Sequence, residues 1–227
     1  MIETLFPPPV LTLSATPEMW SGTLLPEEEA CLSPRAIAKR RREFTAGRVC
    51  ARAALLRLGI RDFPLLAAPD RSPVWPPGIV GSLSHSADYC GVAVARRDLV
   101  AGVGLDVEQA RPLEGRVVSI ICTPAEIRRL DTLPDLPAGL WAMIVFCAKE
   151  STYKCWHPLT RIFLDFHDVE IDLVPRAGTF TARILRTRSA EGGAGPAIRS
   201  LHGRFARDDA HVFAGVTIAA AELPGPD

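Results

Sequence analysis

The stretch Val100-Ala-Gly-Val-Gly-Leu-Asp-Val-Glu108 is short, apolar and β-branched, which predicts a strand that ends on two carboxylates. The segment Gly91-Val-Ala-Val-Ala95 has the same character and predicts a neighbouring strand. Further strand-like segments follow at 169–174, 179–185 and 212–219, with a Gly-rich turn at 191–196. The sequence therefore predicts a fold in which several short strands are joined by turns.

Helices are predicted on both sides of the first two strands. Ser33 can cap a helix that stops at Gly59, with Ile37 on its buried stripe. The segment Thr123-Pro-Ala-Glu126 has the form of a capping box, in which a threonine and a glutamate satisfy the first free N–H groups of a helix. We therefore expect a short helix to begin there.

A longer, almost wholly apolar helix is predicted from about Leu140 to Trp156, stopped by Pro158. The order of helix, strands, helices and strands indicates an α+β fold rather than strict alternation of strands and helices. A chain of 227 residues can form two half-domains. We assign residues 1–105 to an N-terminal lobe and 106–227 to a C-terminal lobe.

Composition and charge exclude several functional classes. Lys plus Arg and Asp plus Glu both number 26, so net charge does not favour nucleic acid or an anionic membrane as a partner. We find neither a secretory signal nor an apolar run long enough to span a bilayer. The six cysteines lie singly, without the spacing of a zinc site. We therefore expect reduced thiols and a cytoplasmic protein.

Asp106 and Glu108 are two apart on the predicted strand, so both side chains leave the same face while Val107 points into the core. Adjacent carboxylates repel each other unless a cation lies between them. Mg²⁺ fits such a pair, because it takes oxygen ligands from one or two carboxylates and from substrate phosphates. The alternative is a strand end that turns into solvent, where acidic residues are common.

Glu150 and Lys154 are four apart on the predicted long helix, close to where it emerges from the core. Lys149 precedes Glu150 and adds a second positive charge. These residues could complete a site for a metal and a phosphate. The alternative is an ordinary surface pair between Glu150 and Lys154, worth about 0.3–0.5 kcal/mol.

A second group of residues could bind a phosphate. Hydroxyls and an imidazole lie together in Gly81-Ser-Leu-Ser-His-Ser86, where Ser84 and His85 are the main candidates, and we interpret this segment as a turn before a strand. Arg48 and Arg52, four apart on the first helix, could grip the same phosphate. An ordinary turn and solvent-facing helix charges are the respective alternatives.

Four blocks in this order resemble the 4'-phosphopantetheinyl transferases of the Sfp type, and within them the EntD-like branch. The blocks are Arg40-Arg-Arg-Glu-Phe-Thr-Ala-Gly-Arg-Val-Cys-Ala-Arg52, Val80-Gly-Ser-Leu-Ser-His-Ser86, Gly104-Leu-Asp-Val-Glu108 and Phe146-Cys-Ala-Lys-Glu-Ser-Thr-Tyr-Lys154. The acidic pair and the Lys-Glu-x-x-x-Lys helix together form a specific signature. The resemblance covers roughly residues 35–185, and it implies two similar α/β lobes that form a pseudo-dimer with coenzyme A between them.

The resemblance also implies a reaction. Phosphopantetheine would move from coenzyme A to a serine of an apo acyl or peptidyl carrier protein of siderophore, nonribosomal peptide, polyketide or fatty-acid synthases, and 3',5'-ADP would leave. The chain would act as a monomer in the cytoplasm. Its C-terminal lobe would hold the metal and dock the carrier, and its N-terminal lobe would grip the nucleotide. The rival hypothesis is a coenzyme A or nucleotide binding protein that has lost transfer activity.

The roles implied by the resemblance divide the candidate residues into three sets. The metal ligands would be Asp106, Glu108 and Glu150, holding Mg²⁺ or Mn²⁺. The catalytic residues would be Glu150, as general base, and Lys154. The coenzyme A contacts would be Arg48, Arg52, Ser84, His85, Lys149 and Lys154. Two positions depart from the family pattern. Arg71 stands in a region that often carries a lysine, and His157 stands where an aromatic residue is more common.

Overall fold

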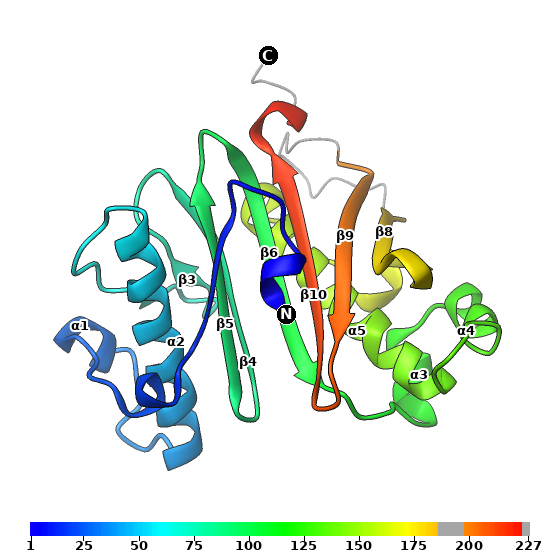
Figure 1. Ribbon diagram of the computed structural model, residues 1–227, viewed down its shortest axis with the longest axis horizontal. Coiled ribbons are helices and arrows are strands. Elements are labelled where there is room, and N and C mark those ends of the chain that lie inside the picture. The colour runs from blue at the N-terminus through cyan, green and yellow to red at the C-terminus, as the bar shows by residue number, and fades with distance from the viewer. Residues whose placement is uncertain (186–197, 224–227) are drawn as a thin grey trace.

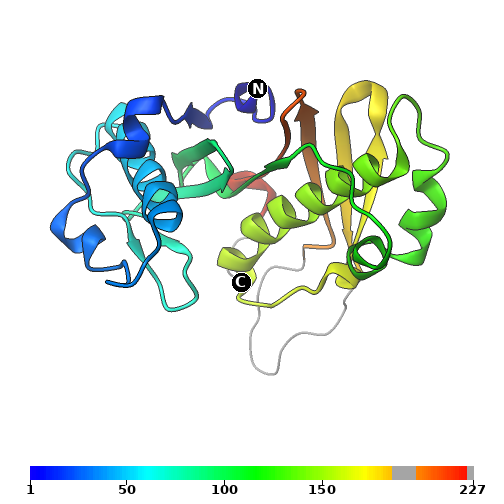
Figure 2. The ribbon, with the colours of Figure 1, turned by 90° about the horizontal axis from the view of Figure 1, so that it is seen from below.

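The computed structural model describes residues 1–185 and 198–223, and the turn predicted at 191–196 lies outside these ranges. The α+β fold with two sheet-containing lobes is confirmed (Figure 1). The two lobes lie side by side, each with one long helix on its sheet (Figure 2). No helix in the described ranges combines the length and the apolar character needed to cross a membrane.

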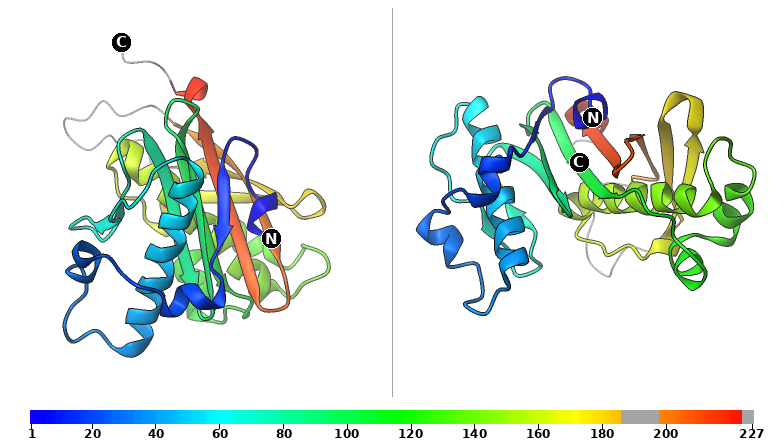
Figure 3. Two further views of the ribbon diagram at one scale, coloured as in Figure 1. Left: turned by 60° about the vertical axis from the view of Figure 1, so that its left-hand side comes forward. Right: turned by 60° about the horizontal axis from the view of Figure 1, so that its bottom comes forward.

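The N-terminal lobe contains a three-stranded antiparallel sheet and a small hairpin. The sheet has the order β1 (Leu11–Ser14), β5 (Tyr89–Arg96) and β4 (Ile79–Ser86), and the hairpin pairs β2 (Leu66–Ala67) with β3 (Pro73–Val74). The helical elements of this part of the chain are η1 (Ile2–Thr4), η2 (Pro17–Ser21), α1 (Pro26–Glu29) and α2 (Ala38–Arg57). Buried residues of α2 pack on β4 and β5, which puts the core of this lobe between helix and sheet (Figure 3).

The C-terminal lobe contains a five-stranded antiparallel sheet. Its order is β6 (Val100–Gln109), β10 (His211–Ala219), β9 (Ser200–Arg207), β8 (Thr179–Ile184) and β7 (Val169–Val174). The helical elements are α3 (Arg116–Ile121), α4 (Pro124–Leu130), α5 (Ala138–Thr160), η3 (Phe166–Asp168), η4 (Pro175–Ala177) and η5 (Ala220–Glu222). Apolar residues of α5 and of this sheet form the largest buried cluster of the described chain.

The ends of the two long helices differ from expectation at three points. The helix predicted from Ser33 begins at Ala38, and Ile37, expected in the buried stripe, is 69% exposed. The stop at Gly59 is confirmed, since this residue has the positive φ of +85° that suits glycine after a helix. Pro158 does not stop α5, because a proline in the last turn removes only a hydrogen bond near the helix end; α5 ends at Thr160, before the left-handed Arg161.

The expected boundary between residues 105 and 106 falls inside β6, and β6 pairs with β10 over its whole length. The sheet pairing therefore moves the boundary to the turn between β5 and β6, at residues 97–99. The N-terminal segment crosses this boundary, since Ile2, Leu5 and Phe6 are buried in a cluster with residues of β6 and β10.

Strand β4 replaces the turn predicted at 81–86, and it lies at the seam where the two sheets meet. One edge of β6 pairs with β10, and its other edge faces β4. The backbone N–H of Leu105 donates to Ser82 Oγ (2.9 Å) and that of Val107 donates to Ser84 Oγ (3.2 Å). Serine side chains therefore satisfy edge groups that would otherwise need another strand.

Candidate functional site

Alternate residues of β6 face α5, in the order Gly102, Gly104, Asp106 and Glu108. A Cβ atom on Gly104 would lie 1.9 Å from the carbonyl oxygen of Ser151, so strand and helix backbones are in direct contact at this point. Towards the carboxyl end of β6 the glycines give way to Asp106, which is 2% exposed, and the partly buried Glu108. Val107 is fully buried on the opposite face, as predicted.

Lys154 of α5 and Ser84 of β4 meet at the carboxylate of Asp106. The Lys154 ammonium donates to Asp106 Oδ1 (2.6 Å) and to Ser84 Oγ (3.1 Å), and Ser84 Oγ donates to the same Asp106 oxygen (3.0 Å). Burial alone would lower the pKa of Lys154, but the charge and hydrogen bond of Asp106 outweigh burial and raise it. Lys154 is therefore a firmly charged group, and its partner is Asp106 rather than the Glu150 expected from helix spacing.

The second oxygen of Asp106, Oδ2, is buried and has no hydrogen-bond partner among the described residues. Burial raises the pKa of Glu108 to about 7, and the negative charges of Asp106 and Glu150 add to the rise. Burial and the charge of Asp106 also raise the pKa of Glu150. An unpaired carboxylate oxygen among three mutually repelling carboxylates fits a bound divalent cation.

The charges of the three carboxylates act on one another, but the side chains do not form a finished metal cage. Within residues 1–185 and 198–223, no group of three acidic, histidine or cysteine side chains stands close enough for ready-made coordination. Magnesium sites commonly use only one or two carboxylates, with substrate phosphates and waters as the remaining ligands. The metal assignment of Asp106, Glu108 and Glu150 stays a prediction, supported by the orphaned oxygen of Asp106.

Lys149 lies elsewhere, although it is the neighbour of Glu150. It is 3% exposed, and its ammonium donates to Glu126 Oε2 (2.8 Å) and to the carbonyl oxygens of Ile121 (2.8 Å) and Phe166 (2.7 Å). All three donors of the ammonium are thus used within the protein. Lys149 ties α5 to α3, α4 and η3, and its expected role as a coenzyme A contact stays a prediction that these bonds disfavour.

Lys149→Met is expected to lower the free energy of unfolding by about 3–5 kcal/mol, because it leaves the buried Glu126 carboxylate without its cation. Chemical denaturation measures this, with Lys39→Met as the control because the Lys39 side chain is 73% exposed. At low temperature, where the variant stays folded, its affinity for coenzyme A should equal that of wild type. A stable variant with weakened coenzyme A binding would contradict this assignment.

The second part of the site is a cluster of positive side chains between α2 and β4. Arg40, Phe44 and Arg48 are spaced by four residues along one side of α2, and the Arg40 and Arg48 guanidinium carbons lie 5.9 Å and 4.1 Å from the centre of the Phe44 ring. Arg40 Nη1 is 3.5 Å from His85 Nε2. Arg40 was not among the predicted contacts; its four-residue spacing to Phe44 and Arg48 could have indicated it.

This cluster is electrostatically suited to an anion. Burial lowers the pKa of Arg48, and the charge of Arg40 acts in the same direction. Burial also lowers the pKa of His85. The charge of Glu43 opposes this shift, and the charges of Arg40 and Arg48 add to it. Arg48 Nε is buried without a hydrogen-bond partner among the described residues. A phosphate dianion would supply the missing acceptor and relieve the repulsion between the cations.

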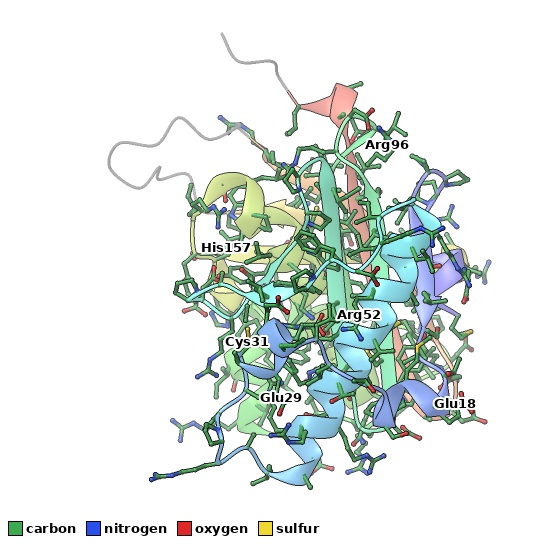
Figure 4. The ribbon with its side chains drawn as sticks, turned by 90° about the vertical axis from the view of Figure 1, so that its left-hand side faces the viewer. Glu18, Glu29, Cys31, Arg52, Arg96 and His157 are labelled. Carbon is green, nitrogen blue, oxygen red and sulfur yellow. The ribbon has the colours of Figure 1, made fainter. Side chains whose placement is uncertain are left out.

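Arg52 does not join Arg48. It forms an ion pair with the fully buried Glu28 and donates to the carbonyl oxygen of Thr23 (2.6 Å). Figure 4 shows Arg52 on α2 beside the segment that carries Glu29 and Cys31. Arg52 therefore holds the α1 segment against α2, and its expected contact with coenzyme A stays a prediction.

Ser84 is also removed from the nucleotide side. Side chains alternate along a strand, so the serines of β4 face β6 while Leu83 and His85 face α2. Consistent with this, Leu83 contacts Gly47 of α2, and Ser84 contacts Asp106 and Lys154. Ser84 thus contacts the acidic part of the site, and its expected contact with coenzyme A stays a prediction.

The role of His157 is structural in part. Its ring stacks on that of Tyr153 at 5.2 Å, and its Nδ1 lies 4.0 Å from Asp70 Oδ2 in the turn between β2 and β3. His157 therefore connects α5 to the hairpin of the N-terminal lobe. The neighbouring Arg71 has a positive φ of +68° in the same turn.

Two family models match the chain, one in each lobe. Residues 27–95 match the 4'-phosphopantetheinyl transferase N-terminal domain, and residues 102–194 match the 4'-phosphopantetheinyl transferase superfamily. The gap between the two matches contains the turn at residues 97–99, where the sheet pairing puts the boundary.

Similar proteins come from several bacteria. The chain is 40% identical to "4'-phosphopantetheinyl transferase PptT" of Mycobacterium tuberculosis, over 96% of this chain and 98% of that protein. It is 40% identical to "4'-phosphopantetheinyl transferase Svp" of Streptomyces mobaraensis, over 97% of this chain and 90% of that protein. The chain is 34% identical to "Enterobactin synthase component D" of Escherichia coli, over 56% of this chain and 61% of that protein.

Proposed function

The chain belongs to the 4'-phosphopantetheinyl transferase superfamily, and on that basis we propose that it transfers 4'-phosphopantetheine from coenzyme A to a serine of apo acyl or peptidyl carrier proteins. The serine oxygen forms a bond to phosphorus as the bond within the pyrophosphate breaks, and 3',5'-ADP leaves. The observation that carries this proposal is the position of Lys154, which touches Asp106 of the acidic group and Ser84 of β4, one residue from His85.

We assign the acidic part of the site to the pyrophosphate. Asp106, Glu108 and Glu150 would hold Mg²⁺, or Mn²⁺ in its place, and the cation would neutralise and orient the pyrophosphate. Lys154 adds a fixed positive charge beside it, and the rise in its pKa keeps that charge in place. Glu150 accepts the proton of the attacking serine. Its partly buried position close to Asp106 supports this role of general base.

We assign the cluster on α2 and β4 to the nucleotide. Arg40, Arg48 and His85 would hold the 3'-phosphate, because they combine two guanidinium groups with an imidazole around a buried, unsatisfied N–H. Phosphoryl transfer depends mainly on positioning and charge neutralisation. The cluster on α2 and β4 would position the nucleotide, and the acidic part with its cation would neutralise the charge of the pyrophosphate. In this proposal Arg52, paired with Glu28, and Lys149, paired with Glu126, stabilise the surrounding elements and do not contact the substrate.

The carrier protein would dock on the C-terminal lobe. Support comes from α3, where Val117 and Ile120 are 46% and 54% exposed, whereas Ile121 is buried in the core. Exposed apolar side chains on α3, a helix that packs against α5, suit a protein partner. We further propose that the enzyme acts as a monomer in the cytoplasm, where its six free cysteines stay reduced.

Mass spectrometry of carrier proteins tests the proposal. The protein is incubated with coenzyme A, Mg²⁺ and a panel of apo acyl and peptidyl carriers, and we expect a phosphopantetheine adduct on at least one carrier, with release of 3',5'-ADP. Chelation of the metal by EDTA should stop the reaction, and added Mg²⁺ should restore it. If coenzyme A binds but no carrier in the panel gains mass, the chain is the inactive coenzyme A binding protein instead.

A further inference from the structure

We propose that Ser84 is the positioning residue of the acidic part of the site: it fixes Asp106 so that only one carboxylate oxygen, Oδ2, is presented to the metal. This inference rests on the proposed function, in which Asp106 is a metal ligand. Ser84 is a positioning residue in this proposal and not a metal ligand. It acts through Asp106 and Lys154, from a strand that belongs to the other lobe.

The hydrogen bonds of the Ser84 hydroxyl are fully used. A hydroxyl has one donor and two acceptor lone pairs. The donor goes to Asp106 Oδ1 (3.0 Å), and the lone pairs accept from the Val107 backbone N–H (3.2 Å) and from Lys154 Nζ (3.1 Å). Ser84 is 5% exposed, so water cannot readily replace any of these partners. The hydroxyl is therefore held in one orientation.

The consequence for Asp106 is an asymmetry between its two oxygens. Oδ1 receives hydrogen bonds from Ser84 and Lys154, whereas Oδ2 is buried without a partner among the described residues. An unpaired buried carboxylate oxygen is costly, so a fold that maintains one has a use for it. Without the Ser84 hydroxyl the carboxylate could rotate, and Lys154 could bond either oxygen.

Ser82 provides a matched control on the same strand. It is two residues away, 4% exposed, and bonds the β6 backbone at Leu105 as Ser84 does at Val107. Among the described residues, the partners of its hydroxyl are backbone groups of Leu105 and not Asp106. Ser82→Ala therefore removes two hydrogen bonds across the seam, both to the backbone of Leu105. Ser84→Ala removes the bond from the Val107 N–H and also frees Asp106.

The test compares the Mn²⁺ affinity of Ser84→Ala, Ser84→Thr and Ser82→Ala with that of wild type. Full-length protein with coenzyme A bound is titrated with Mn²⁺, and electron paramagnetic resonance measures the free ion. Loss of a group that orients a metal ligand typically costs about 10–100-fold in metal affinity. We expect at least a 10-fold weaker affinity in Ser84→Ala and affinities within about twofold of wild type in Ser84→Thr and Ser82→Ala. Transfer by Ser84→Ala should recover at high Mg²⁺, and KM for coenzyme A should stay near that of wild type.

The inference is overturned if Ser84→Ala and Ser82→Ala bind Mn²⁺ equally, or if excess Mg²⁺ does not restore transfer. Should Ser84→Ala fail to fold, Ser84→Cys gives the same comparison, because a thiol is only a weak hydrogen-bond donor. Transfer by the wild-type protein is measured in parallel. If wild type neither transfers phosphopantetheine nor binds Mn²⁺, the proposed function itself fails; if wild type does both and the variants do not differ, only the role of Ser84 fails.

Discussion

Replacing Glu150 with glutamine is expected to abolish detectable transfer to carrier proteins while coenzyme A remains bound with nearly wild-type affinity. Glutamine keeps the size of the side chain but cannot accept the proton of the attacking serine, and it carries no charge for a cation. Loss of a general base alone costs about 10²–10⁴-fold in rate, and loss of a metal ligand adds to this. The partly buried position of Glu150 leaves bulk water poorly placed to replace it.

Single-turnover measurements with a carrier protein give the rate, and calorimetry gives the affinity for coenzyme A. Glu27→Gln is the control, because it makes the same chemical change at an exposed carboxylate on α1. If Glu150→Gln retained more than about a tenth of the wild-type rate, Glu150 would be neither the base nor an essential ligand. The proposed function could survive that result, but the assignment of roles could not.

Gly104→Ala is expected to destabilise the protein and to disable it at the same time. The added Cβ would lie 1.9 Å from the Ser151 carbonyl oxygen and 2.8 Å from the Cys155 backbone nitrogen, so α5 has to move away from β6. Forcing a side chain into a packed site costs about 1–3 kcal/mol, occasionally more. Moving α5 also separates Glu150 and Lys154 from the carboxylates of β6, and a misplacement of about 1 Å can cost 10²-fold in rate.

Gly102→Ala is the matched control, on the same strand and facing the same helix. Its Cβ would lie 3.0 Å from Cys155 Sγ and from Leu159 Cδ1, both at the ends of side chains, so a smaller shift accommodates it. We expect Gly104→Ala to lose more unfolding free energy and at least ten times more activity than Gly102→Ala, by denaturation and by the carrier assay. Equal effects of the two variants would show that backbone contact at Gly104 does not set the position of α5.

Local patterns predicted those parts of the molecule that depend on local interactions. The apolar, β-branched composition of β6, the apolar length of α5 and the capping box at Thr123 were all sufficient. The box is present, with Glu126 Oε2 accepting from the Thr123 N–H at 2.6 Å. The grouping of Arg48 with His85 was also predicted, and the charge of Arg48 helps to lower the pKa of His85.

The predictions differ from the structure where the position of a residue depends on a partner that is distant in the sequence. Strand β4 resembles a turn because its serines are polar on the side that faces β6, and their partners lie 23 residues further along the chain. Arg52 was grouped with Arg48 by helix spacing, but Glu28, from the preceding helix, binds it. Which of Lys149 and Lys154 faces the site depends on the rotation of α5, about 100° per residue, against a core that local patterns do not define.

The burial of Lys149 beside Glu150 has a consequence for how large sets of variants should be scored. A mutational library selected only for carrier modification would rank the two positions together, since both losses end in an inactive cell extract. Scoring protein abundance in parallel would separate them: substitutions at 149 should deplete the folded protein, whereas Glu150→Gln should leave its amount unchanged. The two measurements together would show that Lys149 maintains the folded structure, whereas its neighbour Glu150 takes part in the reaction.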